Sequence, residues 1–312
     1  MGPKRVARSM IQWAIAAVDQ RERLEIEALR LGVGQSQAAM RAHLAPGEWL
    51  AAEFQVFSQW NEDGLIQHLV RHVPIEQSTF VEFGVGSYRE SNTRFLLEHN
   101  NWSGVIFDRG DAHRQFVYRE SEIGWRYAID ARTAFLTRET INEEFRKAGL
   151  CGDIGLLSID VDGNDYWLWE AIDTVSPRIV VCEFNSTFGP EHLITVPYSS
   201  EFSHVEAHHS CLYFGASLPA LVELGRQKGY RFVGCESHGA NAFFVREDVA
   251  GSLPSLVASE GWVRSRFRSS RSPEGQLTYV GDHRERLLLI ADMTVERRPS
   301  GERCSIREVF DL

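Results

Sequence analysis

Two groups of residues in this sequence could do chemistry, and each follows a short apolar run. The first is a glycine turn, GVGS at residues 84–87, which comes directly after the run FVEF at residues 80–83. A helical stretch follows, and a second apolar run then ends in Asp108. A strand, a glycine turn, a helix and a strand ending in an acid make up the first half of a nucleotide-binding βαβ unit. In such a unit the glycines let the backbone approach a ligand, and the acid accepts hydrogen bonds from a ribose.

The spacing of the turn separates two classes of nucleotide ligand. A dinucleotide site has three glycines, and here the third position is taken by Arg89. Glu82, two residues before the first glycine, would repel a pyrophosphate. S-adenosylmethionine carries a sulfonium, an amino group and a ribose diol but no phosphate, so the pattern favours this methyl donor over NAD. The structural alternative is that Glu82 caps the following helix and that Asp108 merely ends a strand.

The second group is a set of acids at two consecutive strand ends. The run LLSI at residues 156–159 is followed by Asp160, Asp162 and a third acid, and the run ending at Cys182 is followed by Glu183 and Asn185. Because parallel strands end at the same edge of a sheet, Asp160, Glu183 and Asn185 should meet there. Such oxygen ligands suit Mg²⁺. The alternative is that Asp160 and Asp162 cap the next helix.

A calcium-binding loop is excluded by its spacing. Gly163 falls at the fourth position of such a loop instead of the sixth, and Ala171 stands where the closing glutamate should be.

Composition limits the class of protein. Of the 312 residues, 43% are hydrophobic and 24% charged, as in an ordinary globular protein. The net charge of −10 argues against a general nucleic-acid binder. The five cysteines show no paired spacing, which indicates a reducing compartment and predicts a cytoplasmic protein. The N-terminal residues are read as a helix and not as a signal peptide or membrane span.

The order of apolar segments predicts three regions. Residues 1–75 are predicted to form a helical extension, interpreted as a lid or an oligomer contact. In the second case the protein would form a homo-oligomer through these helices. Residues 76–250 alternate strands and helices, as in a doubly wound sheet. Residues 251–312 are rich in Arg, Ser and Pro and are predicted to be a peripheral extension with a strand-like run at 287–290. The strands expected in the central region are 80–83, 104–108, 125–129, 154–159, 179–183, 231–235 and 242–245.

These segments carry a resemblance. The chain resembles the class I S-adenosylmethionine-dependent methyltransferases, most closely the FkbM-like and related sugar O-methyltransferases of natural-product pathways, antibiotic biosynthesis included. The resemblance implies an α/β fold with a Rossmann-like seven-stranded sheet that ends in a hairpin. The segments that carry it span about three-fifths of the chain: 58–64, 80–92, 156–172, 179–185, 213–217 and 241–246.

The resemblance also implies roles for particular residues. Around the methyl donor it implies Glu82, Gly84 and Gly86 near the methionine part, Asp108 at the ribose and Asp130 near the adenine. Ser87, Arg109 and Asp160 are further expected donor-binding residues. Metal-dependent members have an Asp at the fourth strand end and an adjacent acid–amide or acid pair at the fifth. This chain has Asp160, but Glu183-Phe184-Asn185 replaces the adjacent pair, which leaves the Mg²⁺ open.

The expected function is methyl transfer from S-adenosylmethionine to a hydroxyl of a sugar-containing or other small-molecule natural product. A hydroxyl needs a base or a metal to remove its proton, and the candidates are Asp160, Asp162, His208, His209 and His238. Two alternatives remain: a Mg²⁺-dependent phosphohydrolase built on Asp160 and Asp162, and a non-catalytic binding protein with a degenerate methyltransferase fold. Neither a nucleic acid nor a membrane is expected as a partner.

Overall fold

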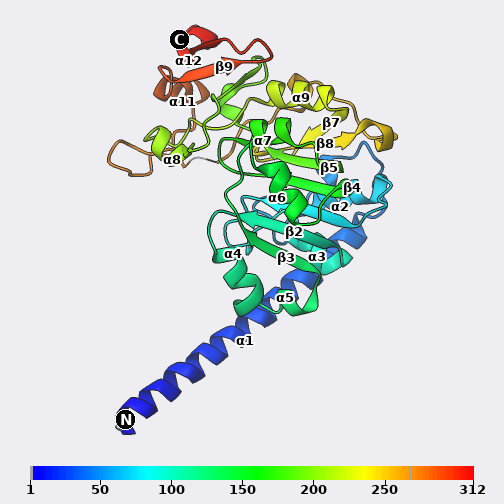
Figure 1. Cartoon of the computed structure of the whole chain (residues 1–312), viewed down its shortest axis with the longest axis vertical. Helices are drawn as coiled ribbons and strands as arrows, with labels where there is room; N and C mark the ends of the chain where they lie inside the picture. Colours follow the sequence, from blue (N-terminus) through cyan, green and yellow to red (C-terminus); the bar gives the residue numbers. More distant parts are fainter. Residues whose placement is uncertain (1–2, 268) are drawn as a thin grey trace.

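The chain folds around a seven-stranded mixed sheet with the strand order β3-β2-β1-β4-β5-β8-β7 (Figure 1). This computed structural model describes residues 3–267 and 269–312, with side chains from residue 22 onward. Neighbouring strands are parallel except β8, which is antiparallel to both β5 and β7. The strands are β1 (Thr79–Phe83), β2 (Ser103–Asp108), β3 (Ile129–Thr133), β4 (Gly152–Ile159), β5 (Val175–Glu183), β7 (Tyr230–Cys235) and β8 (Asn241–Arg246).

This strand order is the one expected of a class I methyltransferase sheet. The antiparallel β8 inserts between β5 and β7 because the last two strands form a hairpin, as the sequence predicts. The predicted fold class is therefore confirmed.

Helices cover both faces of the sheet because its strands are buried on both sides, as parallel strands usually are. Along β1 the side chains alternate: Val81 and Phe83 pack into one core, and Phe80 packs into the other. The first core contains α6 (Ile141–Lys147), α7 (Asp165–Ala171), α9 (Leu218–Gln227) and α10 (Ala258–Gly261). The second contains α2 (Glu62–His72), α3 (Arg94–Asn100), the π-helical turn η2 (Phe116–Glu120) and α5 (Ile123–Arg126). Shorter helical segments are η1 (Leu50–Ala52), α4 (Ala112–Gln115) and η4 (Glu247–Val249).

The N-terminal extension is helical, as predicted. The long helix α1 (Pro3–Met40) extends away from the body of the molecule toward the N-terminus (Figure 1). Its last turns pack on the body, where Ala38 joins Phe57 and Phe95 in a small core. None of the helices in the described part of the chain has both the length and the apolar character of a membrane span.

The third strand lies further along the chain than the sequence indicates. A strand was expected at residues 125–129, but β3 begins at Ile129 and α5 occupies residues 123–126. Trp125 is 72% exposed, so this aromatic residue lies on a surface helix and contributes nothing to the sheet.

The C-terminal region is more than a peripheral extension. Its strands β9 (Thr294–Arg297) and β10 (Arg303–Ser305) pair with β6 (Ile194–Thr195) to form a second, three-stranded sheet. The run at 287–290, expected to be a strand, belongs mostly to helix α11 (His283–Leu289). This helix, α12 (Ile306–Phe310) and the segment that begins with η3 (Ser186–Phe188) share a third apolar core above the carboxyl ends of β4 and β5.

A close backbone contact joins the glycine turn to the end of β4. Gly84 has a φ of +81°, and a Cβ atom placed on it would lie 1.3 Å from the carbonyl oxygen of Asp160. Gly86 also has a positive φ, +54°, but nothing lies within 4 Å of a Cβ placed there. Both positions favour glycine for their backbone angles, and only position 84 also requires it for space.

This difference gives a matched pair of substitutions. We expect Gly84→Ala to lower the free energy of unfolding by at least ~3 kcal/mol, because β1 and β4 must separate to admit the methyl group. Gly86→Ala should cost only the ~1–2 kcal/mol of a left-handed alanine. Denaturant unfolding followed by circular dichroism measures both, and equal losses would contradict the assigned contact.

Candidate functional site

The site lies at the carboxyl ends of β1, β2, β4 and β5, where the strand order reverses about β1. Two adjoining cavities open there, a smaller one of about 310 Å³ and a larger one of about 550 Å³. Both are of a size that holds small-molecule ligands. The cavities share the residues Gly84, Gly86, Asp160, Asp162, His204 and Val205.

The smaller cavity contains the residues expected around a ribose. Asp108 ends β2 and its carboxylate is held by two backbone amides: the N–H of Gly86 donates to Oδ2 (2.9 Å), and the N–H of Gly110 donates to Oδ1 (2.8 Å). Arg109 also lines this cavity. Ala134, Phe135 and Leu136, which follow β3, supply an apolar wall. The structure thus brings Gly84, Gly86, Asp108 and Arg109 together.

Glu82 organises the turn that it precedes. Its buried carboxylate accepts hydrogen bonds from the hydroxyl of Ser91 (2.6 Å), the backbone amides of Asn92 (2.9 Å) and Thr93 (3.2 Å), and the hydroxyl of Thr93. Burial raises the pKa of Glu82, and these hydrogen bonds oppose the rise. Glu82 therefore fixes the N-terminus of α3, the alternative that the sequence left open, while it and Ser87 also line the larger cavity.

Asp130 lies apart from both cavities. It is the second residue of β3, where it faces Val105 of β2 in the ladder, and its Oδ2 accepts a hydrogen bond from Nε of Arg132 (2.6 Å). The described residues that line the two cavities include the loop after β3, residues 134–136, and none of β3 itself. The adenine role was assigned to Asp130 because the strand was expected four residues earlier.

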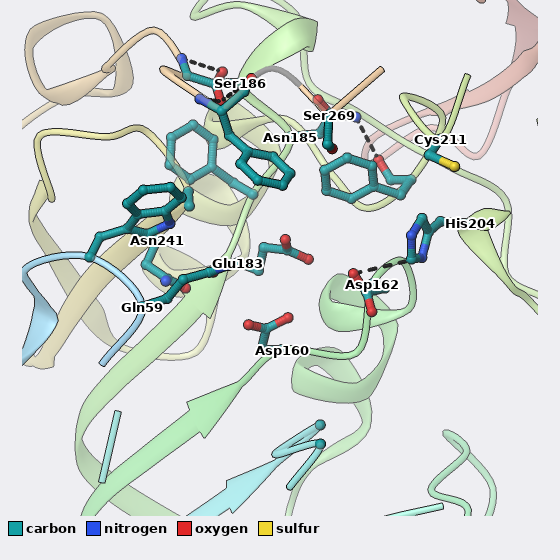
Figure 2. A pocket seen from close by; sticks show the side chains of 18 of the residues that line it. Gln59, Asp160, Asp162, Glu183, Asn185, Ser186, His204, Cys211, Asn241 and Ser269 are labelled. Atoms are coloured by element: carbon teal, nitrogen blue, oxygen red, sulfur yellow. Dashed lines mark hydrogen bonds and ion pairs between the residues drawn. The ribbon is translucent and has the colours of Figure 1, made fainter. Parts of the chain in front are cut away.

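An acidic floor, which we define as Asp160, Asp165 and Glu183, closes the larger cavity from below. One carboxylate oxygen of each lies within 4.8 Å of those of the other two. Asp160 and Glu183 point into the cavity (Figure 2), and Asp165 is fully buried beside them. Burial, followed by repulsion from neighbouring acids (Asp162 first for Asp160, and Asp160 first for Glu183), raises the pKa values of both carboxyl groups well above their ordinary range. Burial also raises the pKa of Asp165 to about 7.

The floor lacks the donors that its carboxylates need. Oε2 of Glu183 is buried without a hydrogen-bond partner, and no residue in the described ranges donates to the side chain of Asp160. Asp165 differs because its two oxygens accept from the amides of Val161 (2.8 Å) and Gly163 (2.9 Å). Unpaired buried carboxylates need a proton or a cation, so the oxygen atoms of the floor fit a divalent metal ion.

Asn185 was expected to be a ligand in this group, but its side chain is already used. Its Nδ2 donates to the carbonyls of Leu212 (2.9 Å) and Phe214 (3.0 Å), and its Oδ1 accepts from the amide of Thr187 (3.0 Å). Asn185 thus caps η3 and holds the following loop in place. Asp165, the third acid after β4 in the sequence, lies in the cluster in its place, although the sequence did not mark it as a ligand.

His204 is a site residue that sequence reasoning missed. It begins the short helix α8 (His204–Ala207), and its Nδ1 lies 3.6 Å from Oδ1 of Asp162 (Figure 2). Both residues line both cavities. Asp162 adopts the left-handed backbone conformation, with a φ of +56°, which lets the chain turn directly after β4.

The predicted histidines lie elsewhere. Nδ1 of His208 is 2.8 Å from the hydroxyl of Ser210. His238 stacks on the indole of Trp60 with ring centroids 4.5 Å apart, so it supports a wall of the larger cavity. Neither these two nor His209 is among the described residues that line a cavity. The adjacent histidines 208 and 209 form a recognisable pair in the sequence, whereas the single His204 has no neighbouring residue that marks it as a candidate base.

The walls of the larger cavity combine rings with polar side chains. Asn241 donates from Nδ2 to Oε1 of Glu62 (2.9 Å), while its buried Oδ1 has no partner in the described structure. Gln59 lies beside it (Figure 2). The rings that line the cavity are those of Trp60, Phe184, Phe214 and Phe267. The C-terminal region forms what we call the roof: Ser265, Phe267, Ser269, Arg271 and Arg286.

Comparison with known proteins gives distant similarities only. No protein-family model matches the chain, and no curated protein is similar to it in sequence. A solved O-methyltransferase family protein from Burkholderia thailandensis is similar over 82% of this chain, at 13% identity and a TM-score of 0.35, and the match spans 64% of that protein.

Two further solved structures are similar at the same level. The N-terminal domain of EvdMO1 with bound SAH matches 72% of this chain and 94% of its own, at 12% identity and a TM-score of 0.37. The O-methyltransferase NcsB1 from neocarzinostatin biosynthesis, solved with S-adenosylmethionine and a naphthoic acid, matches 75% of this chain and 60% of its own, at 15% identity and a TM-score of 0.33. Because these similarities are distant, the fold is assigned from the strand order of the sheet. By that order the chain has the class I S-adenosylmethionine-dependent methyltransferase fold.

Proposed function

We propose that this protein is an S-adenosylmethionine-dependent O-methyltransferase that acts on a hydroxyl of a sugar-containing or other small-molecule natural product. The observation that carries the proposal is the pair of cavities that meet at the glycine turn. One compartment suits the donor and the other the acceptor, so a methyl group held at the junction would face an acceptor hydroxyl. Such alignment of two reactants is the main requirement of an in-line displacement.

The charges of the smaller cavity support a cationic donor. Asp108, Asp160 and Asp162 line it, whereas Arg109 is its one basic lining residue other than histidine in the described structure. Acidic walls attract a sulfonium and repel a pyrophosphate. When bound, S-adenosylmethionine supplies an electrophilic methyl group, and its transfer to a hydroxyl oxygen breaks the carbon–sulfur bond and releases one proton.

His204 is the proposed acceptor of that proton. It lies at the junction of the two cavities, and the carboxylate of Asp162 can orient its ring and stabilise the imidazolium that forms. The distance of 3.6 Å is longer than a hydrogen bond, as is common in sites without substrate. In this scheme Asp162 is a positioning residue and His204 is the base.

The acidic floor is the proposed holder of a divalent cation. Asp160, Asp165 and Glu183 would bind Mg²⁺, which supplies positive charge that lowers the pKa of an acceptor hydroxyl. Without a cation these three carboxyl groups keep their protons to a higher pH than usual, as their raised pKa values indicate. The floor therefore sets the charge beside the acceptor hydroxyl, whether it holds a cation or protons.

The larger cavity supports a cyclic polar acceptor. A volume of about 550 Å³ admits a sugar together with part of an aglycone. The faces of Trp60, Phe184 and Phe214 offer apolar contact to a ring, and Gln59 and the unpartnered Oδ1 of Asn241 offer hydrogen bonds to its hydroxyls.

Donor binding depends on Asp108. We expect Asp108→Asn to weaken binding of S-adenosylhomocysteine about tenfold, because an amide replaces one of the two oxygens that accept from the ribose and the loop amides. Calorimetric titration measures the change. Asp111→Asn is the matched control, since Asp111 is exposed three residues later and bonds to Thr133. A wild-type chain that binds neither S-adenosylmethionine nor its demethylated product would refute the proposed function.

Turnover depends on His204. We expect His204→Asn to lower kcat by about 10²–10⁴-fold, the usual contribution of a general base, while binding of S-adenosylhomocysteine stays unchanged. The rate is followed as S-adenosylhomocysteine formation with the best acceptor from a panel of hexose-containing compounds. His208→Asn is the control and should keep full activity. If His204→Asn turns over at the wild-type rate, the base is another group.

Stability should depend on pH and on Mg²⁺ through the floor. Asp165 has a folded pKa of about 7 against an ordinary value of 3.8, so the folded state binds more protons between these values. The free energy of unfolding of the metal-free protein should therefore fall as pH rises from about 4 to 7. A cation that binds only the folded state reverses this loss, so Mg²⁺ should raise the Tm at pH 8 and EDTA should lower it.

Glu183→Gln separates this metal effect from a general effect of salt. We expect it to abolish the Tm increase by Mg²⁺, whereas Asp173→Asn, a change at an exposed acid, should preserve it. A wild-type Tm that is the same in EDTA and in Mg²⁺ at pH 8 would mean that the floor holds protons and no metal.

A further inference from the structure

Arg286 is a buried arginine for which neither the fold nor the proposed chemistry supplies a partner. It lies on α11 and is only 8% exposed, yet it is one of the residues that line the larger cavity. Its Nη1 donates to the carbonyl of Phe267 (2.9 Å). Its Nε is buried and has no hydrogen-bond partner in the described structure.

The surroundings of Arg286 do not balance its charge. Burial lowers the pKa of this guanidinium, and the positive charge of Arg264 lowers it further. Within the described ranges, no carboxylate lies at ion-pair distance from Arg286. A second roof arginine, Arg271, lines the same cavity, and its guanidinium donates to the carbonyl of Gly275 (3.0 Å).

A buried arginine of this kind destabilises the folded protein unless an anion binds it. Arginine stays protonated in proteins, and a buried charge without a counter-ion is strongly unfavourable. The planar guanidinium presents several donors in a fixed fork that matches a carboxylate or a phosphate. Because Nε of Arg286 has no partner and no carboxylate of the described residues balances the guanidinium at this cavity wall, an oxyanion on a ligand is the partner that fits.

The position of the roof relative to the floor gives the cavity a polarity. Helix α11 packs against η3, which begins at Ser186. Ser186 and Ser269 lie on the side of the cavity opposite Asp160 and Glu183 (Figure 2). The floor carries carboxyl groups that hold protons or a cation, whereas the roof carries the positive charges of Arg271 and Arg286. The guanidinium groups of the roof attract an anionic group, and Arg286 is the buried one of the two.

We propose that the acceptor carries an acidic group, a carboxylate or a phosphate, which Arg286 binds at the roof while the hydroxyl to be methylated faces the floor. This inference rests on the proposed function and narrows its substrate class to acidic sugars or sugar phosphates and their conjugates. Binding at Arg286 orients the acceptor, because the anion is then held at the roof, on the side of the cavity away from Asp160 and Glu183. Arg271 adds a second positive charge at the rim.

The test is calorimetric titration of the full chain, saturated with S-adenosylhomocysteine, with D-glucuronate, D-glucose 1-phosphate and D-glucose. We expect at least one acidic probe to bind about tenfold more tightly than D-glucose, as a charge-assisted hydrogen-bonded pair allows. Preference for glucuronate alone identifies a carboxylate as the bound group, and preference for the phosphate alone identifies a phosphate. Acidic probes that bind no more tightly than D-glucose, or do not bind, overturn the inference.

Variants of α11 locate the effect. Arg286→Met keeps an apolar stem without charge and should bring the Kd of the acidic probe to that of D-glucose, whereas Arg286→Lys should keep part of the preference. Arg284→Met, a change at an exposed arginine on the same helix, is the control and should leave it intact. A preference that survives Arg286→Met overturns the inference.

Titration of S-adenosylhomocysteine into the wild type and each variant measures donor binding separately from acceptor binding. A wild type that does not bind it contradicts the methyltransferase proposal itself. Normal binding of S-adenosylhomocysteine without any preference for acidic probes contradicts only the role of Arg286.

Discussion

The site depends on one contact, the approach of the backbone at Gly84 to the carbonyl of Asp160. It fixes the glycine turn after β1 against the first residue beyond β4, so both cavities share the same edge. Asp108 then holds the other side of the turn through the amide of Gly86. With a side chain at residue 84, the turn could not meet the strand that carries the acids, and the two compartments would lose their junction.

Charge balance is the second constraint, and it follows from the first. Bringing β1, β4 and β5 to one edge crowds Glu82, Asp160, Asp165 and Glu183 into a partly buried space. Glu82 and Asp165 accept hydrogen bonds from hydroxyls or backbone amides, and these bonds also hold the local fold. Asp160 and Glu183 have no such donors and remain available to a ligand. The hydrogen-bond pattern thus distinguishes acids that have donors within the protein from acids that have none, which charge alone does not.

Sequence reasoning succeeded where local pattern determines structure. Buried strands such as β1 and β4 are short apolar runs with clear ends, and glycines with positive φ mark the turn that follows. It failed where tertiary contacts decide. β3 is half-buried and carries Asp130 and Arg132, so its pattern is weak. His204 and Arg286 reach the cavity from irregular or C-terminal segments whose placement follows from packing on η3 and β6, and no local signal reports that packing.

The polarity of the cavity relates donor and acceptor chemistry to each other. In the proposed reaction, acids near the donor favour the sulfonium over the neutral thioether of the product, so by themselves they would stabilise the ground state more than the transition state. A floor that holds protons or a cation reduces this excess stabilisation. The released proton then passes to His204, the proposed base, which Asp162 positions. An anionic acceptor bound at Arg286 adds negative charge on the far side, where it does not compete with the methyl group for the floor. The separation of charge along the cavity therefore favours productive alignment of both substrates over tight binding of either one.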